Sequence, residues 1–558
     1  MSLRKEIVSL LEEMAELMEF DGQNRFKVNA FKNGANTLRR LEGDLEEKIN
    51  DKSIKDVKGI GKGLQHVIYE YYETGSAKEY EELLKKVPPG IHDVLRIRGL
   101  GAKKVKLLFE ELGIDSIEKL EQQCKDGKVA EVKGFSDKSV EKILEEIKRI
   151  KKSSGYMLLS MAVERSRKII EQLSNLKSIE KIESTGEIRR VREIILRIEL
   201  ICSTKNEKKF IIEFSKLFNY NVLDSSILYK IYQLLSVDGS EFILYVTSPD
   251  NYEKVLLQTT GSKEFLQKML DPGNFDFSKE SEYFKSVKSD FVIPEMREEQ
   301  YYELPERLRK QTGLSSEHFR GFFHFHTTAS DGNNTLREMV DEVARYGFQY
   351  AVVCDHSKSA FYANGLKEDR IVEQRKEIDE FNKSSKTKVY HGIESDILRD
   401  GSLDYEDDVL AEFQFIVASI HSLFNLSEDG MTARIIKAVE NPYTDILAHP
   451  TGRLLLSRDG YKVDIKKIID ACVANQVAIE INANPHRLDL DWRNLFYARE
   501  KGCLITINPD AHSTEGVSNI EYGIMIARKA GVQPKEVLNC FSEEDFVKFV
   551  NRKVKRKI

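Results

Sequence analysis

Short β-rich segments alternate with amphipathic helices about seven times after Gly321, and this alternation restricts the fold more than any other feature. A strict order of strand and helix predicts a parallel sheet, because parallel neighbours need a crossover connection. We expect this sheet to close into a barrel. The first intervening helix begins with a capping box formed by Thr335 and Glu338. The predicted strands are Phe322–His326, Tyr350–Cys354, Lys388–Ile393, Phe413–Ile420, Asp445–Ala448, Val477–Ile481 and Leu504–Asn508.

Residues that commonly bind metal ions end most of these strands. Six of the 11 histidines lie there, with carboxylates interleaved. In a strand, residues i and i+2 share a face, so His324 and His326 can reach one ion. The carboxyl ends of barrel strands are also where such folds place their chemistry. The predicted metal ligands are His324, His326, Asp331, His356, Glu394, His421, His449, Asp510 and His512.

This ligand set predicts a site for several ions. Imidazole and carboxylate together suit Zn²⁺, Mn²⁺ or Fe²⁺, and closely spaced ions can activate a water and stabilise an in-line phosphoryl displacement. A single buried histidine is more often a hydrogen-bonded core residue, but six at one end of successive strands are hard to explain in that way. Asp355 and Asp396 are predicted to support ligands or cap helices. The histidines that we predict to be structural are His66, His92, His318, His391 and His486.

Three glycine turns recur within the first 155 residues, which we predict to be mostly helical. They are Val57–Lys62, Ile97–Lys104 and Val132–Lys138, and the first two place hydrophobic-x-Gly-hydrophobic-Gly before a helix. Such a turn directs backbone N–H groups and a helix N-terminus at a phosphate, without reading sequence. The alternative is an ordinary helix hairpin with a solvated basic face. The predicted DNA contacts are Gly59, Gly61, Lys62, Gly99, Gly101, Lys103 and Lys104.

Charge and cysteine content restrict the setting. The net charge of −6 does not indicate nucleic-acid binding, so any DNA contact must come from local features. The six cysteines are scattered without a CxxC pair, which argues against a disulfide framework and suits a reducing cytoplasm. No apolar run approaches the ~20 residues of a membrane span. We therefore expect a cytoplasmic protein without a membrane partner; its oligomeric state stays open, with a monomer as the default.

The segments HFH…SDG, CDHS, GIESDIL, ASIHS, AHPTGRLL and NPDAHS resemble the motifs of the PHP (polymerase and histidinol phosphatase) domain over residues 321–558. The resemblance implies a distorted (β/α)7 barrel that holds up to three ions. It also implies catalytic roles for Glu394, Asp510 and Arg453, the last as a phosphate contact; the alternative for Arg453 is a surface charge. The family pattern assigns His324, His326, Glu394 and Asp510 to the first ion, Glu394, His421 and His449 to the second, and Asp331, His356 and His512 to the third.

The N-terminal half extends the resemblance to the whole chain. The glycine turns resemble helix-hairpin-helix motifs, and with Asn24–Lys32 and Thr260–Lys263 they resemble a bacterial family X DNA polymerase. The implied order is a helical domain with a helix-hairpin-helix (1–90), a fingers-like helix-hairpin-helix domain (91–155), an α+β polymerase-beta-like palm and thumb (156–288), a linker (289–320) and the PHP domain (321–558).

The palm departs from the family pattern. Nucleotidyl transfer needs an Asp-x-Asp pair and a third carboxylate to hold two Mg²⁺ ions. The matching positions carry Arg197, Glu199 and Ile243, and Glu187 replaces a triphosphate-binding serine. Arginine and isoleucine cannot bind Mg²⁺, so we predict a palm without polymerase activity. If the alignment is displaced, the carboxylates that could replace them are Glu193, Asp238 and Glu241, although their spacing is poor.

The leading hypothesis is a metal-dependent DNA nuclease, with Mn²⁺ as the expected ion and Zn²⁺ or Fe²⁺ as alternatives. It is predicted to cut from the 3′ end or at damaged sites in DNA repair, while the N-terminal half binds primed, gapped or nicked DNA. Three alternatives remain open: a small-molecule phosphatase of the histidinol-phosphate type, a non-catalytic DNA-binding scaffold, and an active family X polymerase.

Overall fold

The computed structural model describes residues 3–39, 41, 45–235, 241–271, 273, 275–310 and 312–556. The chain divides into two compact units, Met1–Ser154 and Gly155–Ile558. The first boundary lies close to the predicted end of the helical half at residue 155, whereas the finer subdivision stays a prediction. Within the described ranges, no helix combines the length and apolarity of a membrane span.

The first unit is helical, as predicted. Helix α1 shows why: Ile7, Leu11, Met14 and Met18 follow the i, i+4, i+7, i+11 spacing of one helix face and are fully buried. The helices of this unit are α1 (Leu3–Asp21), α2 (Arg25–Arg39), α3 (Leu45–Asn50), α4 (Lys62–Thr74), α5 (Lys78–Lys86), α6 (Ile91–Leu95), α7 (Ala102–Leu112), α8 (Ile117–Lys125), α9 (Lys128–Glu131) and α10 (Asp137–Ser153).

The second unit begins with a five-stranded sheet in the order β2-β4-β7-β6-β5, in which only β4 and β7 are parallel. The strands of the sheet are β2 (Lys181–Ser184), β4 (Ile198–Ser203), β5 (Asn219–Ser225), β6 (Tyr229–Leu235) and β7 (Glu241–Thr247). Outside this sheet lie β1 (Met157–Leu158) and β3 (Ile194–Ile195). The helices are α11 (Leu159–Ser174), α12 (Gly186–Arg189), α13 (Glu207–Phe214), α14 (Tyr252–Thr260), α15 (Lys263–Met269) and α16 (Glu280–Ser286).

The predicted linker, 289–320, is irregular as expected but is not a free connector. It forms the short turns η4 (Pro294–Met296), η5 (Glu299–Glu303), η6 (Glu306–Leu308) and η7 (Ser316–His318). Ile293 and Met296 pack into an apolar cluster with Phe265. The fully buried Arg297 donates to both carboxylate oxygens of Glu280, at 2.6 and 3.1 Å. Apolar residues spaced between charged ones fix this segment to its neighbours.

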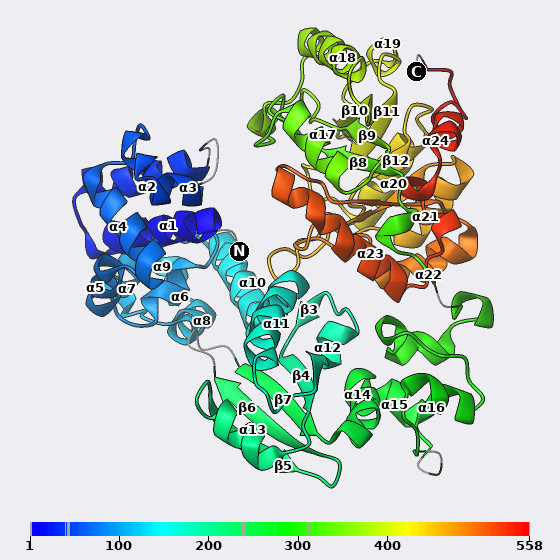
Figure 1. Cartoon of the computed structure of the whole chain (residues 1–558). Helices are drawn as coiled ribbons and strands as arrows, with labels where there is room; N and C mark the ends of the chain where they lie inside the picture. The colour runs from blue at the N-terminus through cyan, green and yellow to red at the C-terminus, as the bar shows by residue number, and fades with distance from the viewer. Residues whose placement is uncertain are drawn as a thin grey trace. The chain divides into compact units, whose positions relative to one another are not determined.

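The remainder of the second unit is a parallel seven-stranded sheet with helices around it (Figure 1). Its strands run in sequence order from β8 to β14, and a bridge between Phe325 and Ala511 links the two edges into a nearly closed barrel. The strands are β8 (Gly321–Phe325), β9 (Tyr350–Val353), β10 (Lys388–Asp396), β11 (Phe415–Ser419), β12 (Ile446–Leu447), β13 (Ala478–Asn482) and β14 (Ile505–Asn508). Each overlaps its predicted segment.

The barrel helices bury an apolar stripe against the strands. Helix α17 begins at the predicted capping box of Thr335 and Glu338 and buries Leu336, Met339 and Val343. At the amino ends of the strands, Phe546 fills the barrel interior against Phe323. The helices are α17 (Leu336–Arg345), α18 (Glu368–Asn382), α19 (Asp407–Leu410), α20 (Glu428–Glu440), α21 (Ile465–Ala474), α22 (Trp492–Lys501), α23 (Ile520–Lys529) and α24 (Glu543–Val550).

Candidate metal centre

The nine predicted ligands gather at the carboxyl ends of the barrel strands. They form four overlapping groups, and within each group one potential ligand atom per residue lies within 4.8 Å of the others. This arrangement differs in detail from the grouping that the family resemblance implies, because His324, His326 and His356 each belong to two groups. The groups are His326, Asp331, His356 and His512; His324, Glu394 and His449; His324, His326 and Asp510; and His356, Glu394 and His421.

Glu394, on β10, lies at the middle of the cluster. Its Oε1 is 3.3 Å from the Nε2 atoms of both His324 and His421, and 3.1 Å from Nε2 of His449. Its Oε2 is 2.8 Å from Nδ1 of His356. Burial alone would raise the pKa of the Glu394 carboxyl, but the charges of the surrounding imidazoles hold it well below its ordinary value. Both carboxylate oxygens therefore face nitrogen ligands, which is the arrangement of a bridging ligand.

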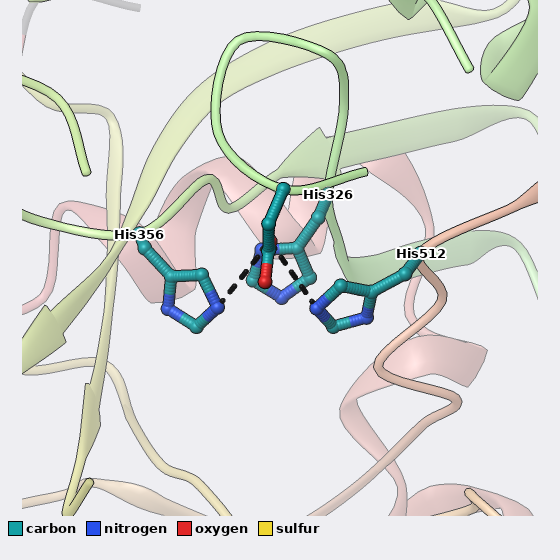
Figure 2. Close-up of side chains that lie close together, drawn as sticks. His326, His356 and His512 are labelled. Atoms are coloured by element: carbon teal, nitrogen blue, oxygen red, sulfur yellow. Dashed lines mark ion pairs between the residues drawn. The ribbon is translucent and has the colours of Figure 1, made fainter. Parts of the chain in front are cut away.

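His326 lies between two other imidazoles on the open side of the cluster, as Figure 2 shows. Its ring centroid is 4.4 Å from that of His356 and 4.1 Å from that of His512. Asp331 Oδ1 lies 3.5 Å from Nε2 of His356 and 3.3 Å from Nε2 of His512. About a third of the Asp331 and His512 side chains is exposed, at 33% and 35%. The cluster thus opens to solvent at these two residues.

Three ligands have a left-handed backbone: His324 (φ 55°), His449 (φ 28°) and Asp510 (φ 53°). This conformation is uncommon for residues other than glycine and concentrates at functional sites. The β8–β9 register shifts between Phe323 and Phe325, so a bulge at His324 interrupts the regular pleat. His324 and His326 therefore do not meet through simple alternation along the strand. The bulge changes the direction of the His324 side chain.

Buried carboxylates around the ligands orient the imidazoles. Glu480, on β13, accepts from Nδ1 of His324 at 2.6 Å and from the backbone N–H of His449 at 2.8 Å. Asp396 lies 2.5 Å from Nδ1 of His421. Burial would lower the pKa of His421, but Glu394 and Asp396 raise it to about 10. Asp396 thus supports a ligand as predicted, whereas Glu480 was missed, although a glutamate within the apolar strand Val477–Ile481 is a signal.

Asp355 holds the loop that carries Asp331. It is fully buried and accepts from the backbone N–H and hydroxyl of Thr327, both at 2.8 Å, and from the Ser330 hydroxyl at 2.5 Å. Gln374 donates to it at 2.6 Å. The predicted supporting role matches these contacts.

The donor chemistry of the cluster fits bound metal ions. His324 Nε2, His326 Nδ1, His356 Nδ1 and Glu394 Oε2 are buried and form no hydrogen bond among the described residues, since the 2.8 Å contact between the last two atoms lacks hydrogen-bond geometry. Buried polar atoms are costly unless they are bonded, and all four belong to ligand groups. His391 lies outside these groups, and its Nε2 contacts Gln374 at 3.1 Å, in keeping with its predicted structural role.

Arg453 contacts the loop that follows β13. Its Nη1 contacts Asp491 at 2.5 Å, and its Nε donates to the backbone carbonyl of Arg487 at 2.9 Å. Its guanidinium therefore braces the loop that follows β13. Arg487 instead lies beside the ligands, with Nε 3.6 Å from Oδ2 of Asp510. Arg453 is therefore not a free surface charge, and its role as a phosphate contact stays a prediction.

The palm positions do not form a comparable group. Glu199 on β4 pairs in register with Ile243 on β7, and its Oε1 accepts from the Tyr245 hydroxyl at 2.9 Å. Arg197 is exposed, and Glu187 accepts from the backbone N–H of Leu196 at 2.8 Å. Among described residues, every group of three or more potential ligands lies in the barrel.

The alternative palm carboxylates do not complete a site either. Glu193 is buried and contacts Arg493 at 3.0 Å, and Glu241 accepts from Gln233 at 3.0 Å. Asp238 lies outside the described residues.

The first two glycine turns have the geometry that the sequence predicts. Gly59 and Gly99 have φ of 100° and 86°, which only glycine adopts easily. Gly61 and Gly101 cap α4 and α7, and a Cβ on either would meet nothing within 4 Å. The space before each helix N-terminus is therefore open on the protein side. The neighbouring lysines that are exposed are Lys62, Lys103 and Lys104.

Comparison with known proteins finds family matches for three segments of the chain and a relative that matches nearly all of it. Residues 2–77 match a helix-hairpin-helix domain, 91–149 a SAM-like helix-hairpin-helix tandem, and 323–484 a PHP domain. The DNA polymerase/3'-5' exonuclease PolX of Bacillus subtilis (strain 168) is 35% identical over 98% of this chain and 99% of its own length. The chain belongs to the bacterial family X DNA polymerases with a PHP domain. This membership confirms the fold class: helix-hairpin-helix domains precede a (β/α)7 PHP barrel.

The barrel of this family X member also resembles shorter proteins. A probable phosphatase of Thermoanaerobacter sp. (strain X514) is 28% identical over 42% of this chain and 95% of its own length. A probable phosphatase of Caldanaerobacter subterraneus subsp. tengcongensis is 26% identical over 42% of the chain and 91% of its own length. The PHP barrel thus occurs both alone and, as here, behind a polymerase-like half.

Proposed function

We propose that this chain is a metal-dependent DNA nuclease whose PHP barrel removes nucleotides from 3′ ends, and that its palm has lost nucleotidyl transfer. The observation that carries the proposal is the convergence of all nine ligand positions on one cluster centred on Glu394. The relative from Bacillus subtilis is named as a DNA polymerase/3'-5' exonuclease and matches this chain over 98% of its length, so its name supports the nuclease part of the proposal and not the loss of nucleotidyl transfer. Cleavage at damaged sites during repair is a second use of the same centre.

The chain's own groups hold and orient the centre. Bound ions, with Mn²⁺ as the expected species and Zn²⁺ or Fe²⁺ as alternatives, would supply a nucleophilic water and neutralise charge on the phosphate. Glu394 belongs to two ligand groups and is the carboxylate that can bridge them, whereas Asp510 belongs to one group, with His324 and His326. Glu480 and Asp396 fix the rings of His324 and His421 through their Nδ1 atoms, so that each Nε2 faces the cluster.

Arg487 is the proposed phosphate contact, in place of Arg453. Its Nε lies 3.6 Å from Asp510, and its side chain is 17% exposed, so it borders both the ligands and solvent. A guanidinium here can bind the non-bridging oxygens of a phosphodiester and stabilise the charge that develops during displacement. Arg453 would act through the loop that it braces.

The N-terminal half is the proposed DNA-binding part. The open helix N-termini behind Gly61 and Gly101 can receive phosphates of primed, gapped or nicked DNA. In the palm, an exposed Arg197 and a buried Ile243 stand where metal-binding carboxylates are needed. This supports a frame that binds DNA without extending it.

A small-molecule phosphatase is the second candidate, and the resemblance of the barrel to the probable phosphatases favours it. The two helix-hairpin-helix matches argue for DNA, because such a phosphatase does not need them. Turnover of duplex DNA against a small phosphomonoester separates the two candidates.

The test is a gel assay with a 5′-labelled primer on a gapped template and Mn²⁺, with and without the four dNTPs. We expect shortening that dNTPs do not reverse and that His324→Ala with His326→Ala abolishes. Shortening that survives the double substitution contradicts the proposal. Extension of the primer means that the palm is active, and tight DNA binding without hydrolysis under any divalent ion indicates a scaffold.

A further inference from the structure

Two neighbouring aromatic side chains are exposed beside the metal centre. Phe361 and Tyr362 lie in the loop between β9 and α18 and are 85% and 71% exposed. The ring of Tyr362 is 6.4 Å from that of the ligand His356. A single exposed apolar residue needs no explanation, but an adjacent aromatic pair next to a ligand at the open end of a barrel marks a surface for binding.

The pair is held on a fixed support. Ala360 and Ala363, on either side of it, are buried. Ser359 donates from its hydroxyl to Asp396 at 2.8 Å and from its backbone to Asp404 at 2.7 Å. These contacts connect the loop to the same carboxylate that orients His421. The aromatic rings are therefore exposed although hydrogen bonds and buried neighbours hold the backbone that carries them in place.

The distribution of exposed apolar residues supports the same location. Among the described barrel residues, the other large apolar side chains counted as exposed are Tyr346, Val372 and Leu423. Leu423 follows the ligand His421 by two residues, so it also lies at the ligand end of the barrel. Tyr346 directly follows α17 and precedes β9, at the opposite end. The aromatic pair is thus the most exposed apolar surface of the barrel and lies at its ligand end.

We propose that Phe361 and Tyr362 form a stacking platform for the bases at the 3′ end of single-stranded DNA whose terminal phosphodiester lies at the metal centre. The proposal rests on the proposed nuclease function and names its substrate as an unpaired end. Every base has a π face, so stacking binds all sequences. A phosphate ester without a ring gains nothing from such a platform, which gives the barrel a preference for nucleic acid.

The test uses the full chain and an oligonucleotide with 2-aminopurine as its 3′-terminal base, titrated with Ca²⁺ in place of Mn²⁺ so that the metal centre is occupied while cleavage is suppressed. Stacking should quench the fluorescence. Phe361→Leu with Tyr362→Leu keeps apolar volume but removes the π faces, and we expect loss of quenching and a Kd about 5- to 100-fold higher. Phe361→Trp should restore quenching relative to Phe361→Leu. Tyr346→Leu, an exposed aromatic at the opposite end of the barrel, is the matched control and should behave as wild type.

A kinetic comparison separates this proposal from the nuclease function. With Mn²⁺, the ratio of kcat/KM for the oligonucleotide to that for glycerol 3-phosphate, a phosphate ester without a ring, should fall in the double leucine variant. If wild type degrades DNA but quenching and this ratio are unchanged in the variant, the platform is overturned while the nuclease stands. If wild type hydrolyses only the small ester, the nuclease function fails, and the quenching alone decides the platform.

Discussion

The five-stranded sheet and the barrel each place a glutamate on a strand, the half-buried Glu199 and the buried Glu394, and the two carboxyls have opposite electrostatic environments. Burial raises the pKa of Glu199, whose hydrogen-bond partner is the Tyr245 hydroxyl. Burial acts on Glu394 in the same direction, but imidazoles on several sides lower its pKa well below the ordinary value. A buried carboxylate is stable in its charged form only where cations or ions face it.

The backbone arrangement of a site and the ligand side chains on it are therefore separate properties. The β4–β7 pairing brings Glu199 and Ile243 side by side, so the backbone juxtaposes two of the positions that the sequence predicts to match the metal-binding carboxylates of a polymerase. Among the described residues, these two positions supply one carboxylate and are part of no group of three potential ligands. In the barrel, the backbone positions carry side chains that can bind metal. A bulge and three residues with left-handed backbone direct these side chains toward the cluster. The proposed division of labour follows from this contrast.

Glu394→Gln should have the largest effect. The amide keeps the shape but removes the negative charge that faces four imidazoles, so ions should bind poorly and DNA cleavage should fall to the background of the assay. Metal content measured on the purified variant, together with the gel assay, checks this. Full cleavage by a metal-depleted variant would show that the metal centre of the barrel does not carry out the reaction.

Arg487→Ala should lower kcat/KM for DNA by about 10²- to 10³-fold, the effect of deleting one group that stabilises developing charge. Its control is Arg453→Ala, which removes a brace that contacts Asp491 and should lower the melting temperature more than Arg487→Ala does. The two variants are compared at a temperature where both are folded. Equal melting temperatures and a larger catalytic loss in Arg453→Ala would restore the role that the sequence resemblance implies.

Glu480→Gln should weaken metal binding by about 10- to 100-fold, as expected for a carboxylate that orients a ligand imidazole. The amide oxygen can still accept from Nδ1 of His324, but without charge. Metal titration measures the affinity, and excess Mn²⁺ should recover much of the cleavage rate. A loss of rate that saturating metal does not recover would instead give Glu480 a role in the reaction itself.

Metal affinity should rise with pH. Burial would lower the pKa of both His421 and His512, but neighbouring carboxylates raise them to about 10 and about 9. These protonated imidazoles stabilise the metal-free barrel below the ordinary histidine pKa of about 6.5, and that contribution is lost as the pH rises through 9 and 10. Binding must displace the protons, so Kd should fall about tenfold per pH unit for each proton between pH 7 and 9. Calorimetry in buffers of different ionisation enthalpy should detect proton release, and its absence would contradict these shifts.

The barrel strands and most of the ligand cluster were predictable because most of the ligands lie at or just after the ends of apolar strands, a signal that is local in sequence. Three features were not. Glu480 gains its meaning only from the neighbouring strands that bring His324 to it. The choice between Arg453 and Arg487 depends on the path of the loop after β13. The packing of 289–320 could not be predicted from the sequence, because apolar residues such as Ile293 and Met296 lie among charged ones.

Glu199→Gln should have the smallest effect and completes the comparison with Glu394→Gln. The amide can still accept from the Tyr245 hydroxyl, so the free energy of unfolding should change by less than about 1 kcal/mol. DNA cleavage should be unchanged, because no barrel ligand contacts this residue among the described side chains. The same gel assay with dNTPs and Mg²⁺ tests the palm directly: if wild type extends the primer and Glu199→Gln does not, the carboxylate serves nucleotidyl transfer after all. In that case, one side chain on β4 would have kept its old role while its neighbours were replaced.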